Sequence, residues 1–163
     1  MRKIIFIGLF IISIPHYVIA SGNSCIEDPK DSDLICFNGT LQNPCDTGSG
    51  YGSMVCSKNS LKKADIELNE LYKKVIAKIE PDSQERKPKT SFIAAQKKWI
   101  EWRDAICLYE QESNSGSGAW QATARNTCLT KITEAKSRAF KQYISCFELG
   151  GDECNLQHSI SAP

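Results

Sequence analysis

Two pairs of carboxylates stand at helical spacing and could act as the acid and base of a sugar hydrolase. Glu67 and Glu70 form one pair, and Glu101 and Asp104 form the other. Lysines stand near the first pair at spacings that favour ion pairing on a helix surface: Lys62, Lys63, Lys73 and Lys74. We therefore interpret both pairs as parts of solvated helix faces.

The residues that other catalytic or metal sites need are missing from the helical part of the sequence. It contains no histidine, no Cys-x-x-Cys pair, no nucleophile with a base and no phosphate-binding loop. His158 stands near the C-terminus, too isolated for a metal site. We expect a protein that is not an enzyme and has neither cofactor nor metal.

Residues 1–20 have the pattern of a secretory signal peptide. Arg2 and Lys3 precede an apolar run, and Ala20 offers a cleavage point. All eight cysteines follow this segment, and an even number of cysteines in an exported chain predicts a disulfide framework. We expect a periplasmic or secreted protein. The residues before Cys25 (Gly22 to Ser24) do not fit a lipid-attachment site, so no membrane anchor is predicted.

Charge excludes one class of partner. Without the signal peptide, the chain has one more acidic than basic residue. A nearly neutral chain offers no electrostatic footprint for nucleic acid, and no nucleic-acid partner is expected.

The periodicity of apolar residues predicts an all-α fold, an antiparallel three-helix bundle stapled by disulfides. Segment 21–53, rich in Cys, Gly and polar residues, is expected to be irregular, followed by a helical domain at 54–148 and a tail at 149–163. The helices are predicted from about Ser53 (as N-cap) to Glu80, from the Pro-flanked connector to about Gln111, and from about Ala119 to Phe147.

The second helix has an unusually wide apolar stripe, which we expect the other helices to cover. Its members follow helical spacing: Phe92, Ala95, Trp99, Trp102, Ile106 and Tyr109. Trp102, together with Trp120, is informative about function. An exposed indole beside apolar neighbours would indicate a surface for a partner.

Hairpin geometry predicts which residues face each other. Cys107 and Cys128 stand almost equally far from the middle of the Gly-Ser turn, so we predict a disulfide between them. By the same argument about the Pro-flanked connector, Asp65 faces Arg103, beside the indole of Trp99.

The other cysteines are assigned less directly. Cys146 is expected to close onto Cys154, because Cys56 would lie roughly 35 Å away along the helix. Three connectivities remain open among Cys25, Cys36, Cys45 and Cys56. We favour the pairs Cys25–Cys36 and Cys45–Cys56.

The helical part resembles the LprI-type lysozyme inhibitor family of exported bacterial proteins. The resemblance rests on spaced motifs in the first helix, the second helix and the start of the third: Cys56, Ala64, Asp65, Leu68, Asn69, Tyr72, Ala95, Gln96, Trp99, Arg103, Asp104, Cys107, Cys128, Leu129 and Thr133. One position departs, because Lys136 stands where the family pattern has Arg. We interpret the matched Asp65, Asn69, Tyr72, Gln96, Trp99 and Arg103 as structural residues of the helical hairpin, in preference to recognition residues.

The resemblance implies that the protein binds and blocks lysozyme or another peptidoglycan-cleaving enzyme. Two loops are candidates for entering such a cleft, Asp46 to Ser53 and Ser113 to Gly118. Their candidate contact residues are Thr47, Ser49, Tyr51, Ser53, Ser115 and Ser117, with Tyr51 as the anchor. For each loop taken singly, we favour the interpretation as a simple turn. The alternative function is a non-enzymatic envelope protein that binds another partner or acts as a scaffold.

Overall fold

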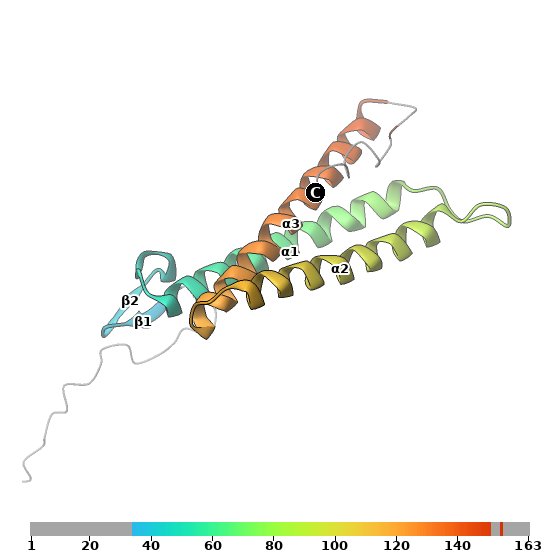
Figure 1. Cartoon of the computed structure of the whole chain (residues 1–163). Helices are drawn as coiled ribbons and strands as arrows, with labels where there is room; N and C mark the ends of the chain where they lie inside the picture. The colour runs from blue at the N-terminus through green and yellow to red at the C-terminus, as the bar shows by residue number, and fades with distance from the viewer. Residues whose placement is uncertain (1–33, 151–153, 155–163) are drawn as a thin grey trace, which may run out of the picture.

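The computed structural model describes residues 34–150 and Cys154. The predicted signal peptide and Cys25 lie outside these residues, so the signal peptide and the Cys25–Cys36 pairing stay predictions. The described elements are, in order, β1 (Ile35–Phe37), β2 (Thr40–Gln42), the 3-10 helix η1 (Pro44–Asp46), α1 (Gly50–Lys78), α2 (Pro88–Ser113) and α3 (Gly118–Glu148). Figure 1 shows this arrangement. The mostly helical, three-helix prediction is confirmed.

The segment before the helices is more regular than predicted. β1 and β2 pair as an antiparallel hairpin, with Ile35 opposite Gln42. The turn between them places Asn38 and Gly39 at positive φ, 50° and 78°, as tight hairpins require for their twist. The short η1 follows.

The first long helix begins earlier than predicted. Its N-cap is Ser49, whose Oγ accepts a hydrogen bond from the Gly52 N–H at 2.9 Å. The predicted cap, Ser53, lies inside the helix and donates its backbone N–H to the Ser49 carbonyl. Either serine could cap a helix, but only Ser49 keeps the extended backbone that a cap needs. The other helix ends lie within about two residues of the prediction.

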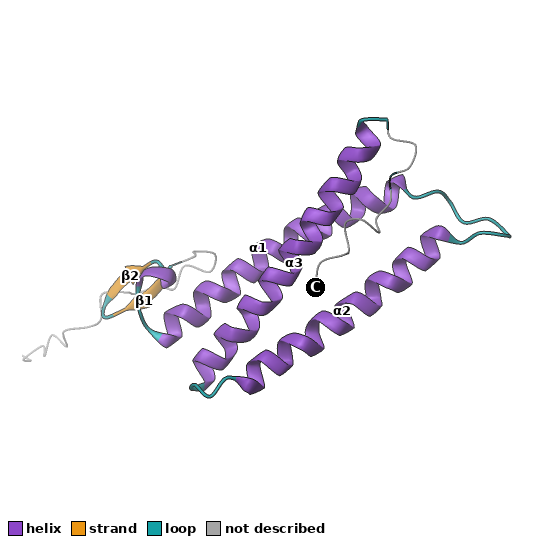
Figure 2. Ribbon diagram, turned by 45° about the horizontal axis from the view of Figure 1, so that its top comes forward, coloured by secondary structure: helices purple, strands orange, loops and turns teal. Residues whose placement is uncertain are grey.

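The hydrophobic core lies mainly between α1 and α3. Successive antiparallel turns make these two helices run in the same direction, and they lie side by side, whereas α2 stands apart from α1 over much of its length (Figure 2). The core side chains come from the C-terminal halves of the two: Leu68, Leu71, Val75, Phe140, Tyr143 and Ile144. From α2, only Gln96 and Cys107 are buried.

Three disulfides join the described elements. Cys107–Cys128 links α2 to α3, Cys45–Cys56 links η1 to α1, and Cys146–Cys154 closes the end of α3. All three pairings were predicted and are confirmed. They are typical of a chain that folds in an oxidising compartment. Within the described part of the chain, no helix combines the length and the apolarity needed to cross a membrane.

Candidate functional site

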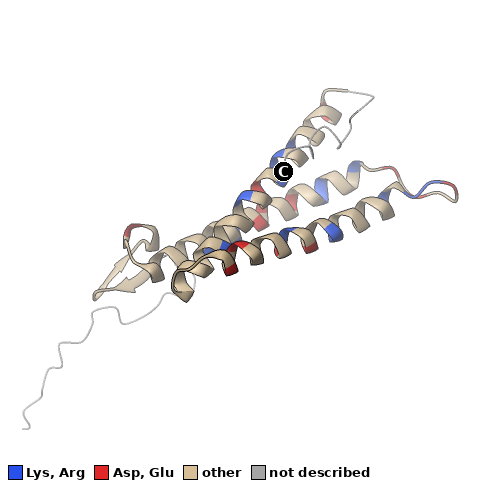
Figure 3. Cartoon of the chain, in the orientation of Figure 1, with Lys and Arg blue, Asp and Glu red and all other residues tan. Residues whose placement is uncertain are grey.

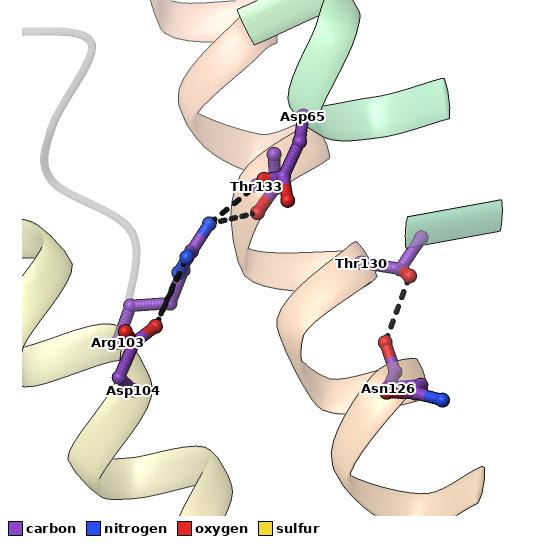
Figure 4. A network of polar contacts seen from close by, with 6 residues as sticks. All are labelled: Asp65, Arg103, Asp104, Asn126, Thr130 and Thr133. Carbon is purple, nitrogen blue, oxygen red and sulfur yellow. Dashed lines mark hydrogen bonds and ion pairs between the residues drawn. The ribbon is translucent and has the colours of Figure 1, made fainter. Parts of the chain in front are cut away.

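Arg103 joins all three helices. Its Nη1 donates to Asp65 of α1 at 3.0 Å and to the Thr133 hydroxyl of α3 at 2.9 Å. Its Nε donates to the neighbouring Asp104 at 3.0 Å (Figure 4). The Arg103 side chain is only 12% exposed, and its Cζ lies 5.4 Å from the centre of the Trp99 ring. The predicted pairing of Asp65 with Arg103 beside Trp99 is confirmed, and Thr133 bonds to a neighbouring helix.

Lys136, where the family pattern has Arg, contacts two aromatic rings. Its Nζ lies 5.4 Å from the Trp99 ring and 5.2 Å from the Phe140 ring, distances at which a cation is attracted to an aromatic face. Burial lowers the pKa of Lys136, because removal from water disfavours the charged amine. Neither ring contact requires the forked hydrogen bonds of an Arg.

Matched residues of α1 (Asp65, Asn69 and Tyr72) and of α2 (Gln96 and Arg103) line the two sides of a groove. We interpreted these residues as structural residues of the helical hairpin, but α1 packs closely on α3, and the space left beside α2 has a volume of about 410 Å³. The groove is lined by Asp65, Leu68, Asn69, Tyr72, Ile93, Gln96, Lys97, Ile100 and Arg103. Five of the six matched residues that we interpreted as structural thus line an opening, and Arg103 and Asp65 also hold the helices together.

In the first candidate loop, most polar side chains make hydrogen bonds within the loop or to the start of α1. Thr47 donates its hydroxyl to the Pro44 carbonyl at 3.1 Å, and Ser49 caps α1. Gly52 fits tightly against this turn, because an added Cβ would fall 1.8 Å from the Thr47 hydroxyl. Ser53 is part of the helix. Tyr51 remains the residue that projects outward, with 55% of its surface exposed.

The second candidate loop lies beside the first. In it, the Asn114 side chain accepts a hydrogen bond from the Gly116 N–H at 3.0 Å, while Ser115 and Ser117 are exposed. Trp120, 46% exposed, lies between the loops. A Cβ on Gly50 would lie 3.3 Å from its indole nitrogen, and one on Gly116 would lie 2.8 Å from its Cβ. The two loops and the aromatic residues Tyr51 and Trp120 therefore form one surface, which we call the tip.

The apolar stripe of α2 is largely uncovered among the described residues, so our prediction of its burial is wrong. Trp102 is 49% exposed, and Ile106 and Tyr109 are exposed on successive turns. Helical periodicity identified the apolar face correctly, but periodicity does not tell whether another element covers that face. Trp102 is therefore an exposed indole beside apolar neighbours, the feature that indicates a surface for a partner.

The four carboxylates considered for catalysis are engaged in ion pairs. Glu67 pairs with Lys141, Glu70 with Lys73, and Glu101 with Lys98, while Asp104 pairs with Arg103. The hydrogen bond from Lys73 lowers the pKa of Glu70, so this carboxylate stays charged at neutral pH. A general acid needs the opposite shift, and this geometry supports the interpretation as solvated helix faces.

The fold defines the class first: this is a domain of three helices stapled by disulfides, with two neighbouring loops at its tip and a groove along its side. The family model described as "Lysozyme inhibitor LprI" matches residues 45–139, more than half of the chain. The protein therefore belongs to the LprI lysozyme inhibitor family, whose description names inhibitors of an enzyme. Among curated proteins and among solved structures, no match was found.

Proposed function

We propose that this protein is exported and binds and blocks lysozyme or another peptidoglycan-cleaving enzyme, using the tip. The match to the lysozyme inhibitor family carries the proposal. The disulfides support the exported location, because they need an oxidising compartment. In this proposal the protein is not an enzyme, and it requires neither a cofactor nor a metal.

The tip suits a cleft that holds two carboxylates, as lysozyme's does. Ser115 and Ser117 make no side-chain hydrogen bond within the described residues, so their hydroxyls are free to donate to a carboxylate. Tyr51 and Trp120 supply rigid aromatic area, the usual anchor of a protein interface. Charged side chains are interspersed along the helices and few at this end of the molecule (Figure 3). The tip can therefore enter a cleft with little loss of ion solvation.

A lysis assay with purified, disulfide-intact protein tests this proposal. We expect the protein to slow the lysis of cell walls by lysozymes of one or more types. Ser115→Glu places a negative charge at the tip, and like-charge repulsion by the cleft should raise the inhibitor concentration needed by about tenfold or more.

Ser91→Glu is the matched control, since it adds the same charge to an exposed serine at the opposite end of α2. This variant should inhibit as well as the wild-type protein. Undiminished lysis at large molar excess of wild-type protein would reject the inhibitor function. Equal potency of the two variants would retain the function but reject the tip as the contact surface.

The exposed stripe of α2 favours a second candidate function, binding of a different envelope partner. Trp102, Ile106 and Tyr109 are all exposed, and their spacing places them on one face of the helix. Groups of exposed apolar residues mark protein contacts. The variant Trp102→Lys separates the two candidates. If the tip carries the function, this variant inhibits lysis normally, whereas loss of inhibition would assign the contact to α2.

A further inference from the structure

One face of α2 has the residue spacing of a coiled coil and is exposed. The members of this face recur at alternating intervals of three and four residues: Ala95, Lys98, Trp102, Ala105, Tyr109 and Glu112. All of them are exposed to solvent. In coiled coils, residues at these intervals form the line along which one helix packs against another. We call this set of residues the α2 seam.

The α2 seam points away from the other two helices. Gln96 and Cys107, the buried residues of α2, lie on the opposite side of the helix from the seam, given 3.6 residues per turn. Ile93 and Ile100, which line the groove, lie on that opposite side too. Among the described residues, no helix of the domain is therefore placed to cover the seam.

The seam is self-complementary in shape when a second α2 runs antiparallel to the first. A two-fold axis between residues 103 and 104 brings Trp102 opposite Ala105 of the second copy, and Ala105 opposite its Trp102. Large side chains thus meet small ones on both sides of the axis, which lets the two surfaces interdigitate. The same axis brings Tyr109 opposite Lys98, a pairing in which the ammonium group is attracted to the ring face.

The charges of α2 are self-complementary in the same orientation. From Pro88 to Lys98 the helix has three lysines and no acidic residue. From Trp99 to its end it has four acidic residues, and its one basic residue there, Arg103, is engaged within the domain. Antiparallel pairing places the basic half of each helix beside the acidic half of the other, whereas parallel pairing would place like charges together.

We propose that the α2 seam pairs this protein with a second copy of itself in an antiparallel, two-fold symmetric dimer. A two-fold interface must be self-complementary, and both the side-chain sizes and the charges of α2 meet this requirement. A partner of different sequence would need no such symmetry. The seam is roughly 27 Å long, and a helix pair of this length buries on the order of 1,000 Å², the low end of specific interfaces. The dimer is therefore weak and reversible.

The dimer leaves the tip of each copy open. The loop from Ser113 to Gly118 follows α2 directly, so antiparallel pairing places the two tips at opposite ends of the paired helices. The pairing of two copies does not rest on the proposed inhibition of lysozyme, and its test measures association without the enzyme.

Sedimentation equilibrium of the disulfide-intact protein, from about 1 µM to about 500 µM, tests the proposal. We expect a monomer–dimer equilibrium with a dissociation constant on the order of 10–100 µM. Trp102→Lys should raise this constant at least tenfold. Ile66→Lys is the matched control, since it adds the same charge at an exposed apolar residue of α1, and it should leave the constant unchanged. A wild-type protein that stays monomeric, or a Trp102→Lys variant that dimerises equally well, would overturn the proposal.

Charge reversal tests the antiparallel orientation. Lys98 pairs with Glu101 in its own helix at 2.8 Å, but both side chains are largely exposed, and such a pair contributes little. In the dimer, Lys98 lies within one helical turn of Glu112 of the second copy. Lys98→Glu and Glu112→Lys should therefore each raise the dissociation constant about threefold to tenfold, and the double variant should dimerise nearly as well as the wild type. Lys62→Glu, at an exposed lysine of α1, is the control and should have no effect. Single variants without effect, or a double variant without recovery, would overturn the antiparallel arrangement.

Discussion

Arg103 is the residue through which all three helices interact. One nitrogen of its guanidinium contacts α1 and α3 at once, and the other two contact Asp104 on its own helix. Arginine suits this role because its fork is planar and permanently charged. The carboxylates of Asp65 and Asp104 are nearly half exposed, so solvent weakens both ion pairs. The Thr133 hydroxyl, fully buried, depends on Arg103 more strongly.

Replacing Arg103 by Met should lower the free energy of unfolding by about 1–3 kcal/mol. The substitution leaves the Thr133 hydroxyl without its donor, while Met retains much of the apolar contact with Trp99. Urea denaturation measures the loss. Arg138→Met, on the exposed face of α3, is the control and should change stability by less than about 0.5 kcal/mol. Equal effects of the two variants would contradict the role of Arg103.

Gly52 holds the tip together by having no side chain. A Cβ at this position would lie 1.8 Å from the Thr47 hydroxyl and 2.6 Å from the Pro44 carbonyl. Gly52→Ala should therefore destabilise the protein by about 1–3 kcal/mol. Gly118→Ala is a strict control, because a Cβ there meets nothing within 4 Å, and this change should be neutral or stabilising by up to about 1 kcal/mol. Thermal melting of both variants measures the difference, and a stable Gly52→Ala variant would contradict this packing.

At the scale of the elements, α1 and α3 form the stable pair and α2 is held by few contacts. Its attachments include the Cys107–Cys128 disulfide, the Arg103 contacts, and the packing of Phe92 and Trp99 against the core. The Phe92 ring stacks on Tyr72 of α1, with ring centres 5.8 Å apart. Helices in proteins are stabilised mainly by packing of an apolar face. Because only Gln96 and Cys107 of α2 are fully buried, this helix depends more than α1 and α3 on such specific links. Both the groove and the exposed apolar stripe exist because α2 is not packed closely along its length.

Removing the Cys107–Cys128 disulfide by a double change to Ala should cost roughly 3 kcal/mol, since the bond closes a loop of 21 residues. We expect the loss of stability to increase local unfolding of α2 before that of α1 or α3. Amide hydrogen exchange measures this, and we expect the amides of α2 to exchange faster relative to those of α1 and α3. An equal acceleration of exchange in all three helices would show that α2 unfolds only with the rest of the domain.

For the whole molecule, the short turns made much of the geometry predictable. Cys107 and Cys128 flank a Gly-Ser turn symmetrically, so antiparallel helices had to bring them together. The pairing of Asp65 with Arg103 followed in the same way from the Pro-flanked connector. These predictions needed only the helical rise and the position of each turn.

Other features could not be predicted from helical periodicity, which identifies faces but not neighbours. The pattern did not reveal that α1 prefers α3, so the groove at Gln96 and the exposure of Trp102 were missed. The sequence does contain a signal for the β1–β2 hairpin, but we did not interpret it as one. Asn38-Gly39 is a strong hairpin dipeptide, but its segment was predicted to be irregular. The proximity of the two candidate loops around Trp120 depended on the packing of α1 against α3.

The tip lies roughly 25 Å along α1 from the groove, so one measurement can separate the surfaces. Amide hydrogen exchange of the disulfide-intact protein, with and without an excess of lysozyme, tests the central claim that the tip contacts the enzyme. We predict slower exchange at the start of α1 and in the α2–α3 turn through Trp120, with no change around Trp102 or Gln96. Protection confined to α2, or no protection under conditions where lysis is inhibited, would contradict the account.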